Sequence, residues 1–289
     1  MAKPALRLPH NAPGALYVDS SCIDCDTCRW MAPAAFTRRD EQSSVATQPR
    51  DEAEWRRALM ALVSCPTASI GVEGGRDLAP ALAALPDEVE PRVLHCGFHA
   101  ESSFGAAAYL VLRPEGNVLV DSPRFAGPLV KRLEELGGVR TLFLTHRDDV
   151  ADHARFAAHF GCERVLHERD VTRGTQAVER RIEGDAPVAL AGDLLVIPTP
   201  GHTAGSACLL FEERVLFSGD HAAWSASRGH VIAFRDACWF DWDVQIESMR
   251  RLLAHRFEAL LPGHGRRCRF DAGAMHAQIE RCVAWMQHG

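Results

Sequence analysis

The stretch Thr145–His153 reads T-H-R-D-D-V-A-D-H and places two histidines and three aspartates within nine positions. An apolar, strand-like segment over 139–144 precedes it, and a helical pattern with Phe156 and Phe160 on one face follows it. The stretch therefore stands where a predicted strand ends and a predicted helix begins. Because imidazole nitrogens and carboxylate oxygens are ligands of divalent metals, it predicts part of a metal site.

Three further motifs each place one such residue directly after an apolar, strand-like run. They are P-G-H-T-A-G-S around His202, L-F-S-G-D around Asp220 and L-P-G-H-G around His264. Ligands from several strand ends that converge on one edge of a sheet can hold a pair of divalent ions with a shared hydroxide. We therefore expect these motifs to form one centre.

In this order, the motifs resemble those of the metallo-β-lactamase-fold superfamily, of which glyoxalase II is a member. The resemblance extends over roughly 89–289 and implies an α/β fold, an αββα sandwich with a metal cleft at the sheet edge. It also implies seven ligands for two divalent ions: His146, Asp148 and His202 on one, Asp152, His153 and His264 on the other, and Asp220 between them. Asp152 and Asp220 would act in catalysis together with a metal-bound hydroxide.

The sequence departs from the usual first motif of this superfamily, H-x-H-x-D-H. Asp148 stands at the second histidine position, and two extra residues precede Asp152 and His153. The insertion leaves Asp149 as an alternative ligand, with helix capping as its other role. Oxygen ligands favour harder ions, so both zinc and iron remain open.

A second motif places Cys22, Cys25 and Cys28 at C-x-x-C-x-x-C spacing, which suits three corners of an iron–sulfur cube. The fourth ligand expected is Cys65, which precedes Pro66 at the end of a helix predicted over 51–64. This pattern resembles the single-cluster [4Fe-4S] ferredoxins, and zinc or free thiols are the alternatives. The other six cysteines lack such spacing and are expected to be small buried residues, with exposure left open for Cys238 and Cys268.

These signals predict three parts of the chain. A small α+β ferredoxin-like domain covers 14–73, a linker rich in Gly, Ala and Pro covers 74–91, and the metallo-β-lactamase-like domain covers 92–289. Within the last part we expect a helix over 123–136 and final helices over 244–255 and 274–287.

The composition limits the classes of binding partner and the cellular location that we expect. A net charge of −6 argues against nucleic acid, and no apolar run reaches membrane-spanning length. Ten cysteines without a recognisable signal peptide favour a reducing, cytoplasmic location. We expect a small-molecule substrate and allow an electron-transfer partner, and the sequence predicts no oligomeric state.

Two functions fit these expectations. The first is a dinuclear hydrolase of the glyoxalase II type, acting on a small thioester, ester or lactam, with a structural or regulatory cluster. The second is a di-iron oxidoreductase that receives electrons from its own [4Fe-4S] domain, since hydrolysis needs no electrons. A sensor of redox state or iron supply is a third. The aromatic stretch with Trp239, Phe240 and Trp242 is predicted either to cover the cleft or to lie in the core.

Overall fold

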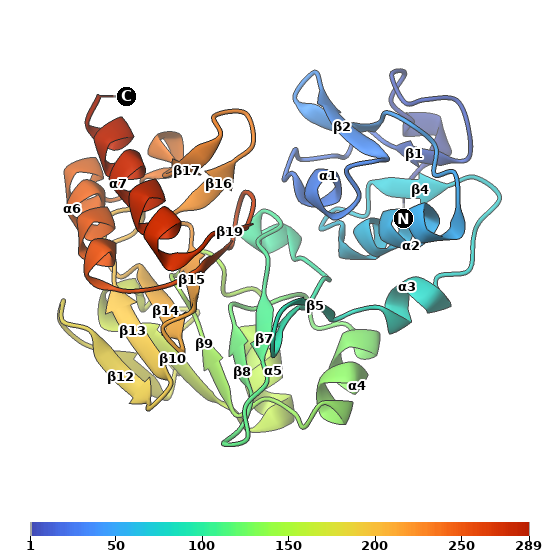
Figure 1. Cartoon of the computed structure of the whole chain (residues 1–289). Coiled ribbons are helices and arrows are strands. Elements are labelled where there is room, and N and C mark those ends of the chain that lie inside the picture. Colours follow the sequence, from blue (N-terminus) through green and yellow to red (C-terminus); the bar gives the residue numbers. More distant parts are fainter. Residues whose placement is uncertain (1, 289) are drawn as a thin grey trace. The chain divides into compact units, whose positions relative to one another are not determined.

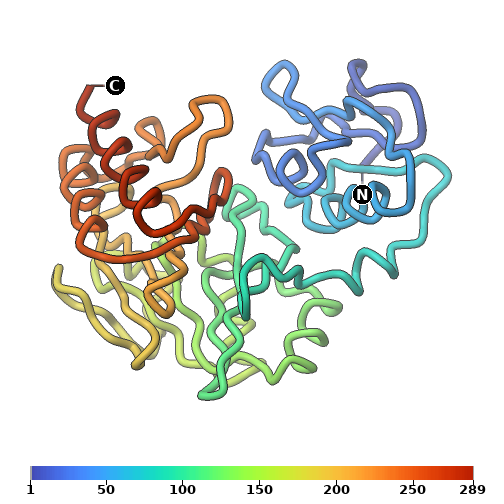
Figure 2. Tube along the Cα trace, in the orientation of Figure 1, coloured from blue at the N-terminus to red at the C-terminus, as the bar shows by residue number. Residues whose placement is uncertain are grey.

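A computed structural model describes residues 2–288, which form two compact units. The first contains the chain through Leu112 together with Pro123–Gly138, and the second contains Arg113–Ser122 together with the chain from Val139 onward. Figures 1 and 2 show the path of the chain. Among the described residues, no helix has both the length and the apolar character needed to cross a membrane.

The N-terminal part of the first unit consists of two antiparallel strand pairs and two main helices. The elements are η1 (Pro4–Leu6), β1 (Leu16–Val18), α1 (Thr27–Met31), β2 (Phe36–Arg39), β3 (Gln42–Val45), α2 (Glu52–Ser64) and β4 (Ile70–Val72), with β1 paired to β4 and β2 to β3. Asp51 caps α2 by accepting a hydrogen bond from the Glu54 N–H at 2.9 Å. The helix ends at Ser64, directly before Cys65, so its predicted end is confirmed.

The rest of the first unit continues into three antiparallel strands. It contains α3 (Ala79–Ala83), β5 (Asp87–Glu90), β6 (Val93–His95), η2 (Glu101–Ser103), β7 (Tyr109–Val111) and α4 (Gly127–Glu135). Strand β6 pairs with both β5 and β7. The segment expected as a linker, 74–91, thus holds a short helix and a strand of the sheet.

The second unit begins with four parallel strands. These are β8 (Val118–Val120), β9 (Thr141–Phe143), β10 (Glu163–His167) and β11 (Arg180–Ile182), with α5 (His153–Phe160) and η3 (Glu168–Asp170) between them in the chain. The strand predicted over 139–144 and the helix after the aspartate-rich stretch are both present.

A second sheet follows, in the strand order β12-β13-β14-β15-β18-β19. Its strands are β12 (Val188–Ala191), β13 (Leu194–Pro198), β14 (Ala207–Phe211), β15 (Val215–Gly219), β18 (Ala259–Pro262) and β19 (Cys268–Arg269). All neighbouring pairs are antiparallel except β15 and β18, which run parallel. The parallel pairing brings the ends of β15 and β18, and therefore Asp220 and His264, to one edge.

Two helices cover one face of this sheet. The remaining elements are β16 (Ala223–Ser225), β17 (His230–Ile232), η4 (Arg235–Ala237), α6 (Trp242–Arg251), η5 (Leu252–Ala254) and α7 (Ala272–His288). Helices α6 and α7 lie side by side in both views (Figure 1, Figure 2). Their apolar side chains, such as Met249 and Ile279, share a buried cluster with Leu216 and Leu260 of the sheet. The mixed α/β class predicted from the sequence is confirmed.

Candidate functional site

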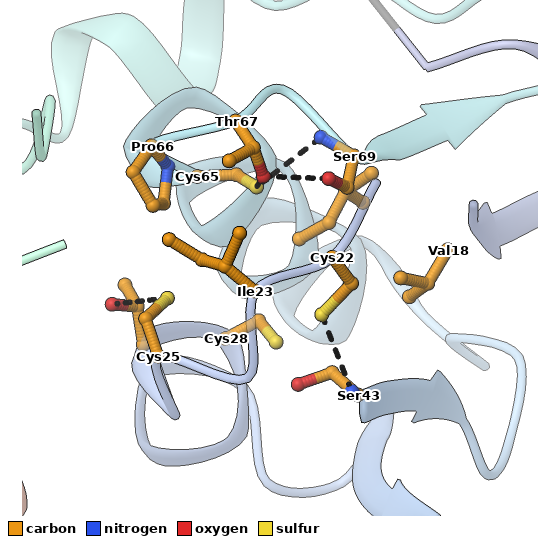
Figure 3. A pocket seen from close by; sticks show the side chains of 12 residues that line it. Val18, Cys22, Ile23, Cys25, Cys28, Ser43, Cys65, Pro66, Thr67 and Ser69 are labelled. Atoms are coloured by element: carbon orange, nitrogen blue, oxygen red, sulfur yellow. Dashed lines mark hydrogen bonds between the residues drawn. The ribbon is translucent and has the colours of Figure 1, made fainter. Parts of the chain in front are cut away.

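The four cysteines predicted to hold the cluster, Cys22, Cys25, Cys28 and Cys65, line one pocket in the first unit (Figure 3). Two of their sulfurs already accept backbone hydrogen bonds: the Ser43 N–H donates to Cys22 Sγ at 3.4 Å, and the Ser69 N–H donates to Cys65 Sγ at 3.3 Å. Apolar side chains, among them Ile23, complete the lining. Four thiols with N–H donors in an apolar pocket have the donor set of an iron–sulfur cluster.

The loop that carries the first three cysteines is held by an arginine. Asp24 and Asp26 take positive φ angles of 61° and 64°. The buried Arg29 guanidinium lies 2.6 Å from Asp24 and 2.5 Å from Asp26, and it also donates to Ser43 at 2.8 Å. Burial opposes the charge of Arg29, but the two aspartates raise its pKa. These ion pairs therefore stabilise a turn whose positive φ angles are unfavourable for most residues other than glycine.

The second centre begins where β9 ends. The Asp121 carboxylate accepts bonds from the Thr145 N–H at 2.8 Å and the Thr145 hydroxyl at 3.0 Å. The same hydroxyl oxygen lies 3.0 Å from His146 Nδ1, and its own hydrogen is donated to Asp121. His146 Nδ1 must therefore carry a hydrogen, which leaves the lone pair on Nε2 free to bind a metal.

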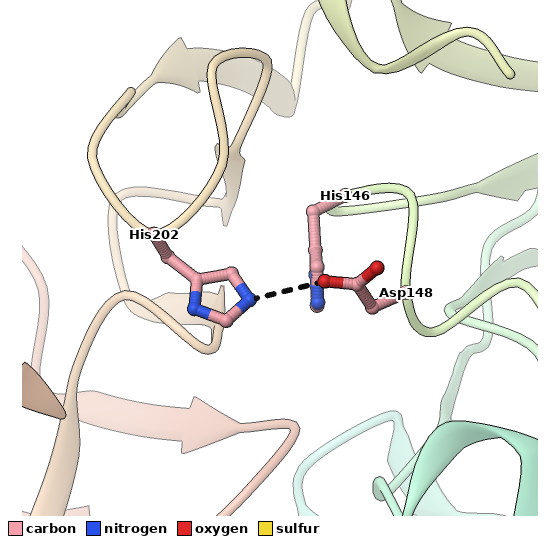
Figure 4. Close-up of side chains that lie close together, drawn as sticks. All are labelled: His146, Asp148 and His202. Carbon is pink, nitrogen blue, oxygen red and sulfur yellow. Dashed lines mark ion pairs between the residues drawn. The ribbon is translucent and has the colours of Figure 1, made fainter. Parts of the chain in front are cut away.

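Two overlapping groups of ligand atoms share His146. One comprises His146, Asp148 and His202 (Figure 4), and the other comprises His146, Asp149 and Asp220. In each group the ligand atoms lie within 4.8 Å of one another. Asp149, for which the sequence left a capping role open, thus belongs to the centre.

Asp220 lies at the middle of this arrangement. Its Oδ2 is 3.9 Å from His146 Nε2, 3.7 Å from His202 Nε2 and 3.8 Å from His264 Nε2. Asp149 is in turn 3.9 Å from the Nε2 atoms of both His146 and His264. Two ligand atoms bound at about 2.1 Å to one tetrahedral ion are about 3.4 Å apart, so these spacings are close to those of ligands around a cation.

The burial and charges of these residues also fit a cation. His146 Nε2, His202 Nε2 and Asp149 Oδ2 are buried and have no hydrogen-bond partner among the described residues. Burial and the neighbouring charge of Asp220 raise the pKa of Asp149 well above its usual value, whereas burial lowers the pKa of His146 to about 4. A neutral imidazole beside crowded carboxylates is the state that a divalent ion binds.

Asp152 and His153 are directed to other partners. Asp152 lies at the start of α5 and forms an ion pair with Arg155 at 3.6 Å. His153 Nδ1 lies 3.3 Å from the Arg164 guanidinium, and burial together with that charge lowers its pKa. Neither residue belongs to a ligand group within residues 2–288. The two inserted residues carry them onto the helix, whereas Asp149 remains in the loop.

Two features missed by the sequence analysis support the loops of this centre. Asp170, which is buried, accepts hydrogen bonds from the Arg147 N–H at 3.0 Å, the Thr203 hydroxyl at 2.5 Å and the Gly205 N–H at 2.8 Å. Asp121 directly follows β8, and its position after an apolar strand was the available signal.

The glycine before His264 is explained by its close approach to the centre. A Cβ on Gly263 would lie 2.8 Å from Asp149 Oδ2.

The aromatic stretch divides into two parts. Trp242 packs against the buried cluster of the second sheet, whereas Trp239 and Phe240 are 61% and 54% exposed. The backbone N–H of Trp239 donates to the His202 carbonyl at 2.9 Å, and the centroids of the two side-chain rings are 6.3 Å apart. An exposed aromatic side chain thus lies directly beside a candidate ligand.

His221 gives a prediction about acid stability. It is buried, neither ring nitrogen has a hydrogen-bond partner among the described residues, and burial lowers its pKa to about 3. In the unfolded chain the pKa of this histidine would be about 6.5. The contribution of neutral His221 to stability is therefore complete above that pH and is lost as the pH falls toward 3. His221→Leu should reduce this loss of stability by about 1.4 kcal/mol for each pH unit below about 6.5. Urea unfolding at several pH values measures it.

The exposed His276 provides the control. His276→Leu removes a histidine whose side chain is not buried, so it should not reproduce the effect that burial gives to His221→Leu. An equal slope for His221→Leu and the unchanged protein would contradict the assignment.

Comparison with known proteins agrees with both halves of this description. The family described as "4Fe-4S single cluster domain of Ferredoxin I" matches residues 18–72. The solved structure of DIM-1 metallo-β-lactamase aligns with 70% of this chain and 95% of its own, at 13% identity and a TM-score of 0.54. A metallo-β-lactamase from Pontibacter korlensis aligns with 70% of this chain and 98% of its own, at 16% identity and a TM-score of 0.51.

At these identities the structural matches establish the fold alone. The family match over 18–72 includes all four cysteines of the pocket. The predicted fold class is thereby confirmed. The chain joins a single-cluster 4Fe-4S ferredoxin domain to a metallo-β-lactamase fold.

Proposed function

We propose that this protein is a metal-dependent hydrolase with a dinuclear centre that acts on a small thioester, ester or lactam. The observation that carries the proposal is the position of Asp220, whose Oδ2 is nearly equidistant from the Nε2 atoms of three histidines. A carboxylate in that position can contact two ions at once. We place the domains at 14–73 and 92–289, and β5 of the segment 74–91 between these bounds pairs with β6 of the second.

The proposed ligand set differs from that implied by the superfamily resemblance. His146, Asp148 and His202 would hold one ion, Asp149 and His264 the other, and Asp220 would lie between the ions. Asp149 takes the role that the resemblance gave to Asp152, and His153 is left out because it faces Arg164.

Bound divalent ions would supply an activated water and a Lewis acid at the substrate carbonyl. The protein's part is to keep the ligands oriented and deprotonated. Thr145 fixes the tautomer of His146, and Asp121 fixes Thr145. Asp148 is half-exposed, so the side of the centre that it occupies is open to a substrate. Trp239 would contact the apolar part of the substrate beside His202.

A di-iron oxidoreductase is the second candidate, and one observation favours it. Three carboxylates, those of Asp148, Asp149 and Asp220, accompany the histidines. Oxygen-rich sites favour harder ions such as iron. In that case an electron-transfer partner would reduce the cluster, and the cluster would pass electrons to the pair of iron ions.

Metal and sulfide analysis of anaerobically purified protein separates these functions. The hydrolase predicts about four irons with sulfide plus about two zinc ions. Mild chelation should then abolish hydrolysis of a glutathione thioester, a chromogenic ester or a β-lactam, and added zinc should restore it. The cluster absorbance should persist throughout.

About six irons, two of them outside the cluster and reducible through it, would instead support the oxidoreductase. A preparation without any ions beyond the cluster, and inactive after metal addition, would contradict both proposals.

A further inference from the structure

Four polar side chains form a continuous hydrogen-bonded chain that ends beside the cysteine pocket, entirely within the first unit. Asp19 directly follows β1, and Ser69 directly precedes β4, which pairs with β1. Both side chains are buried, at 2% and 0% exposure. Ser21 Oγ lies 2.5 Å from Asp19 Oδ1 and 2.7 Å from Ser69 Oγ. Ser69 Oγ lies 2.6 Å from Thr67 Oγ1, which is 3.8 Å from Cys65 Sγ (Figure 3).

The carboxylate of Asp19 fixes the direction of every bond in this chain. Besides the Ser21 hydroxyl it accepts from two backbone N–H groups, at 3.0 and 2.7 Å. A hydroxyl has only one hydrogen to donate. Because Ser21 donates its hydrogen to Asp19, Ser69 must be the donor to Ser21, and by the same rule Thr67 must be the donor to Ser69. The Thr67 hydrogen is therefore directed away from Cys65 Sγ.

A second hydroxyl of the pocket is oriented by a cation. The Ser43 side chain is 1% exposed, and its Oγ accepts a hydrogen bond from the Arg29 guanidinium at 2.8 Å. A guanidinium only donates, so the Ser43 hydrogen remains for another acceptor. Burial raises the pKa of the Cys28 thiol, and a hydrogen bond with the Ser43 side chain opposes that rise. The Ser43 hydrogen is therefore directed toward Cys28.

Ser43 and Ser69 are otherwise closely matched. Both side chains are buried and line the pocket, and the backbone N–H of each donates to a cysteine sulfur, at 3.4 Å and 3.3 Å. They differ in the charged group at the far end of their hydrogen bonds, since Arg29 gives a hydrogen and Asp19 takes one. The pocket thus has one hydroxyl that donates to sulfur and one, that of Thr67, that is kept from doing so.

The apolar lining of the pocket, which includes Val18, Ile23 and Ile70, gives these orientations an electrostatic consequence. Hydrogen bonds to sulfur raise the reduction potential of an iron–sulfur cluster, because they stabilise the added negative charge of its reduced state. In apolar surroundings such a bond is weakly screened. The direction of each hydroxyl therefore affects how readily the cluster accepts an electron.

We propose that two buried charged side chains set the reduction potential of the cluster by orienting the hydroxyl groups beside it. Asp19 lowers the potential because it draws the Thr67 hydrogen away from sulfur. Arg29 raises the potential because it leaves the Ser43 hydrogen for a sulfur. Both are positioning residues that act through serine hydroxyls. The inference depends on the cluster in the cysteine pocket, but not on hydrolysis or on the metals of the second unit.

A redox titration of the holoprotein at one pH, followed by electron paramagnetic resonance, tests the proposal with two variants that change no charge. Ser43→Ala should lower the midpoint potential because a donor to sulfur is lost. Ser69→Ala should raise it, because the Thr67 hydrogen loses its acceptor and turns to Cys65 Sγ. One such hydrogen bond should change the equilibrium constant for reduction about tenfold, which is about 59 mV for one electron.

Thr67→Val shows whether this hydroxyl is responsible. Alone it should leave the midpoint nearly unchanged, because its hydrogen is directed away from sulfur in the native protein. Combined with Ser69→Ala it should cancel the rise. Ser44→Ala is the control, since it removes a buried hydroxyl that is not among the residues lining the pocket, and it should retain the native midpoint.

The signs of these shifts decide the outcome. A midpoint for Ser69→Ala equal to or below the native value, or one for Ser43→Ala equal to or above it, would overturn the proposal. A fall in Thr67→Val alone as large as that in Ser43→Ala would do the same, since it would show that the Thr67 hydroxyl already donates to sulfur. This last comparison still decides if Ser69→Ala assembles no cluster.

Discussion

Asp220→Ala is expected to lower the rate of hydrolysis by about 10³-fold or more, because in the proposed centre this one carboxylate would contact both ions. In the structure its Oδ2 lies between 3.7 and 3.9 Å from three histidine nitrogens, whereas the Asp149 carboxylate lies 3.9 Å from two of them. The variant should also bind fewer than two ions beyond the cluster. The visible absorbance of the cluster should be unchanged, since the cysteine pocket belongs to the other unit.

Asp152→Ala is the matched control for this experiment. The superfamily resemblance makes Asp152 a ligand, but in the structure its carboxylate pairs with Arg155 at the start of α5. We therefore expect Asp152→Ala to keep its metals and activity, whereas Asp149→Ala should lose both. Loss of metal in Asp152→Ala with full retention in Asp149→Ala would restore the ligand set implied by the resemblance.

Cys65→Ala should prevent assembly of a complete four-iron cluster. Cys65 lies more than thirty residues after the C-x-x-C-x-x-C motif, yet it lines the same pocket as Cys22, Cys25 and Cys28. With three thiols left, the pocket cannot occupy every corner of the cube. Iron and sulfide content, together with visible absorbance, would measure the loss of the complete cluster.

Cys96→Ala tests whether this effect is specific to the pocket. Cys96 is fully buried, burial alone raises the pKa of its thiol, and it is not among the residues that line the pocket. Its replacement should leave the four-iron cluster intact. Equal loss of cluster in both variants would indicate general destabilisation instead of lost ligation.

Much of this protein could be predicted from local patterns. The strand and helix around Thr145–His153, the helix ending at Cys65 and the last two helices follow from short-range periodicity. The cysteine motif alone predicted an iron–sulfur site, because thiols three residues apart can reach one cluster without help from distant parts of the chain. The Asp220 and His264 motifs followed strands, so their convergence was also predictable.

The local path of a loop could not be predicted in the same way. Two inserted residues turned Asp152 and His153 onto α5 and left Asp149 facing His146 and His264. Side-chain direction in a loop depends on φ and ψ at each residue, and here also on Asp170, which lies in a different part of the chain. Spacing alone carries none of that information.

The sequence by itself therefore predicted two kinds of metal-binding motif and their order, because ligand type and strand position are local properties. Only the tertiary structure decided which aspartates lie beside the histidines of the candidate centre, and only it placed Asp170 beside Thr203 and Gly205. The contacts of Asp170 join residues that are far apart in the chain, and burial, not spacing, selects them.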